Sequence, residues 1–305
     1  MFPWTLLVCS VTLFHDAVSF VPFNKRSQLY STDSLQYTPT QIDCIDMRST
    51  PGEYYYESEE KYEVCGFYII ADADSLVEIE LTDINVNCDE NNALALIDGW
   101  ELQGEYFPSP FDHKRSLEER YQTFCGNSKP HKKYISSQNV ALIQFLIPSP
   151  GQSFKVKVRF IPNPRPCNVV ATMEFGILTL KNYGEINNCS ISIIYPEKIY
   201  LVDVDVGVSS EQPSVKPTSG LSVQCSANGK SDYVELLYGD GLDTDIMGRK
   251  IAFCGLRARA AKRGIHMGCQ HSVVRLVSSG SFYNSITFSF QAMTPDEIYN
   301  STDIC

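Results

Sequence analysis

The stretch FKVKVRF (residues 154–160) alternates apolar and basic side chains at every position. A period of two puts one set of side chains in a core and the other in water, which is typical of a β-strand with one solvent face. The stretches 77–81, 202–206 and 286–290 have the same period of two, with acidic or hydroxyl side chains at the polar positions. Residues 140–147 are almost continuously apolar, as a strand covered on both faces would be. Because helical periodicity is scarce, the pattern predicts an all-β protein built from antiparallel β-sandwiches.

Composition narrows the class of protein further. The chain has 305 residues, of which 43% are hydrophobic, and this length suggests about two domains of roughly 150 residues each. Its 25 Lys and Arg against 36 Asp and Glu give a net charge of -11, which repels nucleic acid and favours cationic or amphipathic ligands. Eleven cysteines without any CxxC pair indicate disulfides rather than metal clusters. We therefore expect an oxidising compartment and no nucleic-acid partner.

The N-terminus predicts secretion. Residues 4–14 form an apolar run with the length of a signal-peptide core, and Ala17-Val18-Ser19 offers a small-x-small cleavage pattern, so residues 1–19 are predicted to be a signal peptide. The basic region that usually precedes such a run is missing, and the alternative is a buried first strand. No later stretch reaches 18 apolar residues, which predicts a secreted, extracellular protein without a membrane partner. Sequons at Asn188 and Asn300 predict a glycoprotein, although Cys189 lies inside the first sequon.

Cysteine spacing divides the mature chain into two similar halves. The first two cysteines of each half, at 44 and 65 and at 167 and 189, are separated by 21 and 22 residues. Three prolines in 162–166 cannot continue a central strand and mark the boundary. We expect a flexible N-terminal segment over 20–36, a first domain over 37–163 and a second domain over 164–305. Sequential pairing within each half is the simplest scheme, and it predicts the bonds Cys44–Cys65, Cys88–Cys125, Cys167–Cys189, Cys225–Cys254 and Cys269–Cys305.

Longer motifs carry a resemblance to a known family. The order of these motifs resembles that of the CUB domain: a cysteine is followed after about twenty residues by a second cysteine and then by a D-x-L turn. The closer similarity is to the corticotropin-releasing factor-binding protein family, and it is carried by DGWELQGEYFPS (98–109), ERYQTFC (119–125), SSQNVALI (136–143), PCNVV (166–170), NCSISIIYP (188–196), DYVELLYGDGLD (232–243) and VVRLVSSG (273–280).

The resemblance implies a fold and a function. The fold would be two tandem CUB-like antiparallel β-sandwiches of the jelly-roll type, stapled by consecutive disulfides. The function would be that of a secreted, non-enzymatic protein that binds peptide hormones similar to corticotropin-releasing factor, such as diuretic or stress hormones, and withholds them from receptors. The alternative function is a CUB-type extracellular scaffold that binds another protein or a glycan without hormone specificity. The segment DGWELQGEYFPS, which general CUB modules lack, favours the hormone-binding family.

Two groups of residues are candidates for contact with such a peptide. In the run GEYYYESEEKYE (52–63), Tyr54, Tyr55, Tyr56 and Glu57 combine rigid aromatic area with carboxylate charge, which suits a basic amphipathic peptide. The alternative is a solvated hairpin whose tyrosines lie on a sheet. Asp46 follows Cys44 closely, and the resemblance links an acid at this position to ligand binding; the alternative is an acid that bonds its own backbone in a turn. The basic residues that relatives carry just before this cysteine are missing from 38–43.

Other chemistry has little support in the sequence. No catalytic motif is present, so we expect no enzyme activity, no cofactor and no metal. Asp232, with Asp240 and its neighbours, fits either a calcium site or a solvated turn. The basic run Arg249–Arg263 fits either a site for a heparin-like glycan or an exposed loop.

Overall fold

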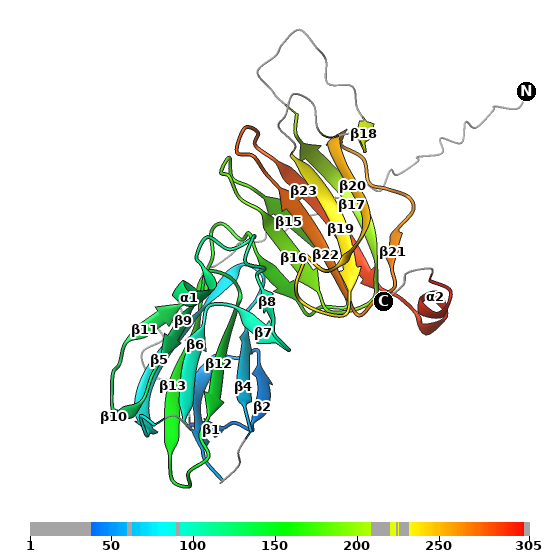
Figure 1. Ribbon diagram of the computed structural model, residues 1–305. Helices are drawn as coiled ribbons and strands as arrows, with labels where there is room; N and C mark the ends of the chain where they lie inside the picture. Colours follow the sequence, from blue (N-terminus) through cyan, green and yellow to red (C-terminus); the bar gives the residue numbers. More distant parts are fainter. Residues whose placement is uncertain are drawn as a thin grey trace, which may run out of the picture. The chain divides into compact units, whose positions relative to one another are not determined.

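A computed structural model of the chain describes residues 38–59, 63–89, 92–208, 220–223, 225 and 232–301. The expected signal peptide and the N-terminal segment 20–36 lie outside these residues. The described secondary structure is almost entirely β-strand (Figure 1), and its helices are the short α1 (Leu117–Arg120) and α2 (Pro295–Tyr299). The prediction of an all-β protein is confirmed.

The first half of the chain folds as two facing sheets. One sheet has the order β1 (Thr40–Gln41), β3 (Gly52–Glu57), β13 (Ser153–Pro162), β5 (Ser75–Val86) and β10 (Gly126–Ser128), with β11 (Lys133–Ile135) also paired to β5. The other sheet has the order β2 (Ile45–Arg48), β4 (Cys65–Ile70), β12 (Val140–Leu146), β6 (Ala93–Ile97) and β9 (Tyr121–Thr123). A separate hairpin is formed by β7 (Trp100–Leu102) and β8 (Glu105–Phe107).

The second half repeats this arrangement. Its strands follow one another in the order β14 (Val169–Ala171), β16 (Cys189–Ile193), β22 (His271–Val277), β19 (Tyr233–Gly239), β20 (Gly248–Arg257), β17 (Glu197–Val206), β23 (Ser285–Ala292) and β15 (Phe175–Lys181). Two short strands extend it, β18 (Gly220–Ser222) beside β20 and β21 (Ile265–Met267) beside β17. The run β14-β16-β22-β19-β20 corresponds to β2-β4-β12-β6-β9, and in each run the first strand is parallel to the second.

Strand β20 belongs to both sheets of the second sandwich. Its first part pairs with β19 and its last three residues pair with β17. At the start of the second part, Gly255 has a φ of 113°, and a Cβ there would lie 2.4 Å from the carbonyl oxygen of Gly220. Glycine is therefore required where the strand changes sheets.

Disulfides join neighbouring elements of each half. The structure contains four of the predicted bonds, Cys44–Cys65, Cys88–Cys125, Cys167–Cys189 and Cys225–Cys254. Cys269 is also disulfide-bonded, but Cys305 lies outside the described residues, so the pair Cys269–Cys305 stays a prediction.

The predicted side-chain alternation is visible in the core of the first sandwich. Phe154, Val156 and Val158 of FKVKVRF are buried between the sheets of the first sandwich, as the period of two predicts. In the continuous apolar strand β12, Ala141 and Ile143 face this core, whereas Val140 and Leu142 belong to a second cluster on the outer face of the sheet. The strand is thus covered on both sides, as the sequence indicated.

The acidic residue Glu197 lies in the core of the second sandwich. Glu197 is fully buried at the start of β17; one carboxylate oxygen contacts Ser272 Oγ and the other has no hydrogen-bond partner among the described residues. Burial raises the pKa of Glu197 well above its usual value, and the bond from Ser272 offsets only part of that effect.

Replacing this carboxyl group is expected to stabilise the protein at neutral pH. Because the folded pKa lies above the unfolded value of about 4.3, the free energy of unfolding falls as pH rises from the unfolded pKa to the folded one, by about 1.4 kcal/mol for each pH unit between the two. Glu197→Gln removes this loss. Urea unfolding at pH 4.5 and pH 7.5 should show a smaller decrease for Glu197→Gln than for the wild type. The exposed control Glu174→Gln should behave as the wild type does; equal decreases in all three proteins would contradict the assignment.

Candidate functional site

Asp46 lies on β2, at the edge of its sheet. The disulfide Cys44–Cys65 and a hydrogen bond from the Gly66 N–H to the Cys44 carbonyl oxygen (2.8 Å) attach the start of β2 to β4. One guanidinium nitrogen of Arg48 donates to Asp46 Oδ2 at 2.7 Å. Among the described residues β2 pairs only with β4, so its other edge is unpaired. Asp46 is thus held in an ion pair on an open edge strand.

The opposite face of β2 carries two exposed apolar side chains. Ile45 is 67% and Met47 is 56% exposed. They lie opposite Gly66 and Tyr68 in the register of β2 and β4 and therefore share the outer face of the sheet with Tyr68. Sequence reasoning singled out Asp46 but missed these two neighbours, although their alternation with Asp46 and Arg48 was visible. Edge strand β2 can therefore offer a ligand apolar contact on its outer face, whereas the Asp46 carboxylate, 12% exposed, lies on the inner side beside Arg48.

The tyrosine run of β3 divides between the core and the surface. The Tyr54 ring packs against Phe67 at a centroid distance of 5.1 Å, and the Tyr56 ring packs against Phe145 at 4.4 Å. Both tyrosines are buried, which corrects the expectation that they contact a ligand at the surface. Tyr55, whose hydroxyl donates to Gln41 Oε1 at 3.3 Å, and Glu57 point outward.

The segment DGWELQGEYFPS folds as the hairpin β7–β8 over the outer face of a sheet. Trp100 Nε1 lies 3.2 Å from the carbonyl oxygens of both Ile69 and Ala141. Trp100 and Phe107 are buried in one cluster with Val140 and Leu142. The aromatic residues of this motif therefore cover apolar surface that would otherwise face water.

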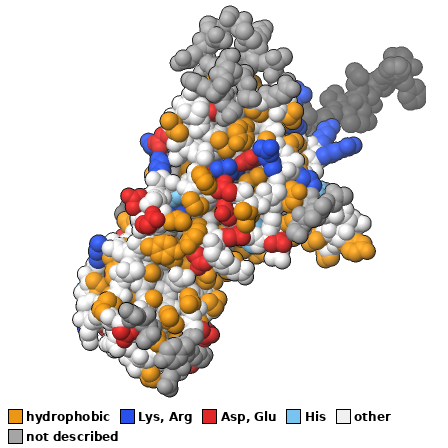
Figure 2. Space-filling model, in the orientation of Figure 1, with side chains coloured by type: hydrophobic (Ala, Val, Ile, Leu, Met, Phe, Trp, Pro, Cys, Tyr) orange, Lys and Arg blue, Asp and Glu red, His pale blue; other side chains and the backbone are white. Residues whose placement is uncertain are grey.

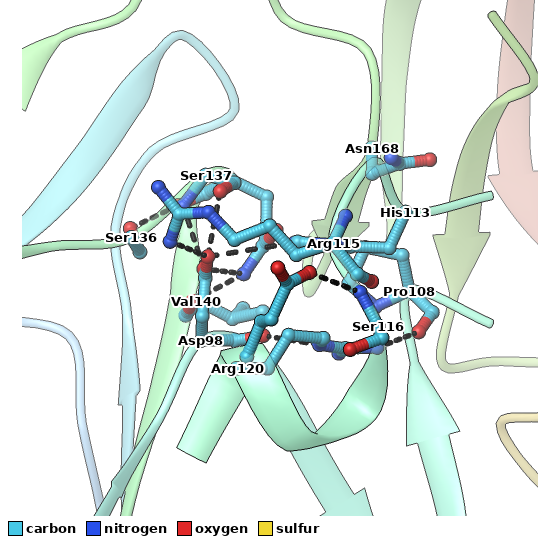
Figure 3. Close-up of polar contacts among 12 residues, drawn as sticks. Asp98, Pro108, His113, Arg115, Ser116, Arg120, Ser136, Ser137, Val140 and Asn168 are labelled. Carbon is cyan, nitrogen blue, oxygen red and sulfur yellow. Dashed lines mark hydrogen bonds and ion pairs between the residues drawn. The ribbon is translucent and has the colours of Figure 1, made fainter. Parts of the chain in front are cut away.

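A single arginine fixes both ends of this segment (Figure 3). The buried Arg120 donates to the carbonyl oxygens of Asp98 (2.9 Å), Phe107 (3.2 Å) and Pro108 (2.8 Å). Gly99 has a φ of 125°, and a Cβ there would lie 2.2 Å from the Phe107 carbonyl oxygen and 2.4 Å from the Arg120 side chain. Glycine is required at this turn because the chain passes so close to the guanidinium group.

The Asp98 carboxylate joins this turn to the SSQN motif (Figure 3). It accepts hydrogen bonds from the Ser137 N–H (2.7 Å), the Ser137 hydroxyl (2.6 Å) and Gln138 Nε2 (2.8 Å). Burial opposes ionisation of Asp98, but the contact with His113 Nε2 at 3.4 Å and the hydrogen bonds from Ser137 outweigh it and hold the pKa at about 2. Two of the motifs that carry the family resemblance therefore contact each other and have a structural role.

The carboxylates considered for calcium are separated by their contacts. Asp232 is buried and accepts bonds from the Ser279 N–H (2.8 Å) and Asn284 Nδ2 (2.6 Å). Asp240 lies beyond the other end of β19. Within the described part of the chain, one group brings three His, Cys, Asp or Glu ligand atoms together, namely Cys44, Glu63 and Cys65, and its two sulfurs form a disulfide.

The basic residues predicted to bind a glycan are spread along β20 and beyond it. Arg249 and Lys250 begin β20 and Arg257 ends it, about 26 Å away at 3.3 Å per residue. Lys and Arg side chains stand in several separate groups on the face shown in Figure 2. A single basic patch over Arg249–Arg263 therefore has no support.

The two sequons differ in exposure. Asn188 is half-buried and its amide donates to the Phe111 carbonyl oxygen at 3.3 Å, whereas Asn300 is exposed. Glycosylation at both stays a prediction.

Comparison with known families identifies the class of protein. Residues 36–162 match the corticotropin-releasing factor binding protein N-terminal domain, and residues 169–299 match the C-terminal domain of the same family. The chain is a disulfide-bonded double β-sandwich of the binding-protein type. It belongs to the corticotropin-releasing factor-binding protein family.

Individual relatives agree with this assignment. The chain is similar to corticotropin-releasing factor-binding protein of Rattus norvegicus (34% identity, 85% of this chain and 78% of the relative), of Ovis aries (35%, 84% and 77%) and of Xenopus laevis (36%, 82% and 76%). Among solved structures it is similar to the CUB1-EGF-CUB2 domain of human MASP-1/3 (12% identity, 79% of this chain and 99% of that chain, TM-score 0.27). At that score the likeness adds nothing to the fold argument, which rests on the strand order. No helix among the described residues has the length and apolar character needed to cross a membrane.

Proposed function

We propose that this protein is secreted, binds a peptide hormone similar to corticotropin-releasing factor and limits activation of the hormone's receptor. The observation that carries the proposal is that both domain models match, with relatives of 34% to 36% identity that are named for binding this factor. The disulfides and the predicted signal peptide support an extracellular location.

The proposed mechanism is sequestration by mass action, without enzyme chemistry or a cofactor. A binder present at 100 times its dissociation constant leaves about 1% of the hormone free. The net charge of -11 favours encounter with a basic peptide, since opposite charges accelerate association. Affinity and concentration alone then set how much hormone reaches its receptor.

The proposed contact residues are those of the sequence prediction that lie outside the hydrophobic core: Asp46, whose side chain is 12% exposed, Tyr55 and Glu57. Asp46 already has a cation beside it, because Arg48 forms an ion pair with it. A basic group of the ligand would therefore compete with Arg48 for this carboxylate. The exposed Ile45 and Met47 on the other face of β2 give the same strand apolar contact area.

Asp46→Ala is expected to weaken hormone binding about tenfold, or about 1.4 kcal/mol, since the ligand loses its carboxylate partner. Isothermal titration with an amidated peptide of the corticotropin-releasing factor type measures this change. Asp43→Ala, which removes an exposed carboxylate three residues away, is the matched control and should bind as the wild type does. Arg48→Ala should keep or raise the affinity because it frees Asp46. Unchanged affinity in a folded Asp46→Ala variant would remove Asp46 from the site.

A further inference from the structure

The second sandwich has an exposed apolar surface that the predicted contact residues do not include. On the edge strand β15, Phe175 is 73% and Ile177 is 68% exposed. Their side chains share the outer face of the sheet with Tyr200 of β17, because both strands pair with β23 (Figure 1). Within the described residues, β15 pairs only with β23, so this surface includes a sheet edge.

The outer faces of β15, β23 and β17 form a shallow groove, here called the trough, whose floor is β23 and whose walls are side chains of β15 and β17. Ile177 lies opposite Ser289 of β23, and Ser289 lies opposite Tyr200 on the other side. The outer face of β23 carries mostly short side chains, Ser285, Thr287 and Ser289, between taller walls on β15 and β17. Two strand spacings of about 4.8 Å place the walls roughly 10 Å apart. The apolar end encloses a groove of about 400 Å³ lined by Phe175, Gly176, Ile177, Tyr200, Ser289, Phe290 and Gln291.

Charge differs between the two ends of the trough. Asp203 and Asp205 of β17 lie opposite Thr287 and Ser285, and among the described residues neither carboxylate has a cation within ion-pair distance. Burial, and then repulsion from Asp203, raises the pKa of Asp205. Lys181 lies two strands away from Asp205, across Ser285. At the apolar end, Lys198 is neutralised by Glu297 at 2.8 Å. The charged end therefore carries two carboxylates against one lysine.

We propose that this trough binds an amphipathic helical segment of the peptide ligand, with the apolar face of the helix between Phe175, Ile177 and Tyr200 and a basic residue at Asp203 and Asp205. An α-helix with its side chains is about 10 Å in diameter, and the wall side chains fill part of the similar distance between the two strands, so the helix would rest across the walls and insert the side chains of one face. Four side-chain rows from Phe175 to Lys181 span about 20 Å, or roughly 13 residues of helix. The proposal rests on the proposed function, because it assigns a further contact surface to the same ligand.

The test is a titration of four proteins with one amidated peptide of the corticotropin-releasing factor type. The double variant Phe175→Ser, Ile177→Ser should lose about tenfold in affinity. Its fold should be kept, because both side chains are largely exposed. Asp203→Asn with Asp205→Asn should also weaken binding, more at low salt than at high salt, because salt screens the attraction. Ile246→Ser changes a side chain that is 70% exposed elsewhere in the same sandwich and should bind as the wild type does.

Three other outcomes overturn the proposal in different ways. If the wild type and the double variant bind equally, the trough is not a contact surface and the proposed function stands. If the wild type binds no such peptide, the proposed function and the trough proposal both fail. If the double variant changes only the oligomeric state in sedimentation, and not peptide affinity, the trough is an interface between copies of the chain.

Discussion

Arg120→Met should lower the free energy of unfolding by about 3 kcal/mol or more, among the largest effects expected for a single substitution in this protein. The buried guanidinium donates to three carbonyl oxygens at the two ends of the hairpin segment 98–109. Methionine fills similar volume but leaves those buried acceptors without a donor, and each costs about 1–3 kcal/mol. Urea unfolding followed by circular dichroism measures the change.

Arg115→Met is the matched control for this substitution. The Arg115 side chain is mostly exposed and pairs with Asp98 at 3.1 Å, so its loss should cost about 1 kcal/mol or less. If both variants unfold at the same urea concentration as the wild type, Arg120 does not hold the hairpin and the structural role given to the motif is wrong.

Removing the first disulfide should affect stability and binding together. The double variant Cys44→Ser, Cys65→Ser opens a loop with a sequence separation of 21 residues, for which the chain-entropy model gives about 3 kcal/mol. It also detaches the start of β2, so Asp46 loses its fixed position beside β4. We expect a lower unfolding free energy and weaker hormone binding, measured by urea unfolding and by titration.

The second sandwich supplies the control for this pair. Cys167→Ser with Cys189→Ser opens a loop of almost equal size, with a separation of 22 residues, and leaves β2 untouched. It should cost similar stability and retain the contact at Asp46. Equal losses of affinity in the two double variants would show that binding follows stability and not the position of β2.

Local alternation in the sequence was sufficient to predict the fold class, whereas the four described disulfides followed from the cysteine spacing shared by the two halves and from the family resemblance. Alternation in FKVKVRF identified core residues because the period of two needs no knowledge of neighbouring strands. The same rule, applied to GEYYYE, would have separated the tyrosines: Tyr55 alternates in step with Glu53 and Glu57, whereas Tyr54 and Tyr56 do not. The expectation that Tyr54 and Tyr56 contact a ligand was wrong because it was based on how many tyrosines the run contains, and not on which of them alternate toward the core.

Contacts between distant segments could not be predicted. The trough depends on Ile177, Ser289 and Tyr200 becoming neighbours, and only strand pairing brings them together. Arg120 reaches the carbonyl groups of Phe107 and Pro108 through a turn whose geometry the sequence does not encode by spacing alone. The Arg48 partner of Asp46 is different, because two residues apart on one strand share a face, and that signal was present.

Direct calorimetric titration of the folded, disulfide-bonded protein tests hormone binding itself. The injected peptides are an amidated peptide of the corticotropin-releasing factor type and an unrelated basic amphipathic helix of equal length and charge. We predict saturable heat for the hormone-type peptide and none for the unrelated helix. A folded, disulfide-bonded preparation that gives no heat with any hormone-type peptide would contradict the account and favour a CUB-type scaffold.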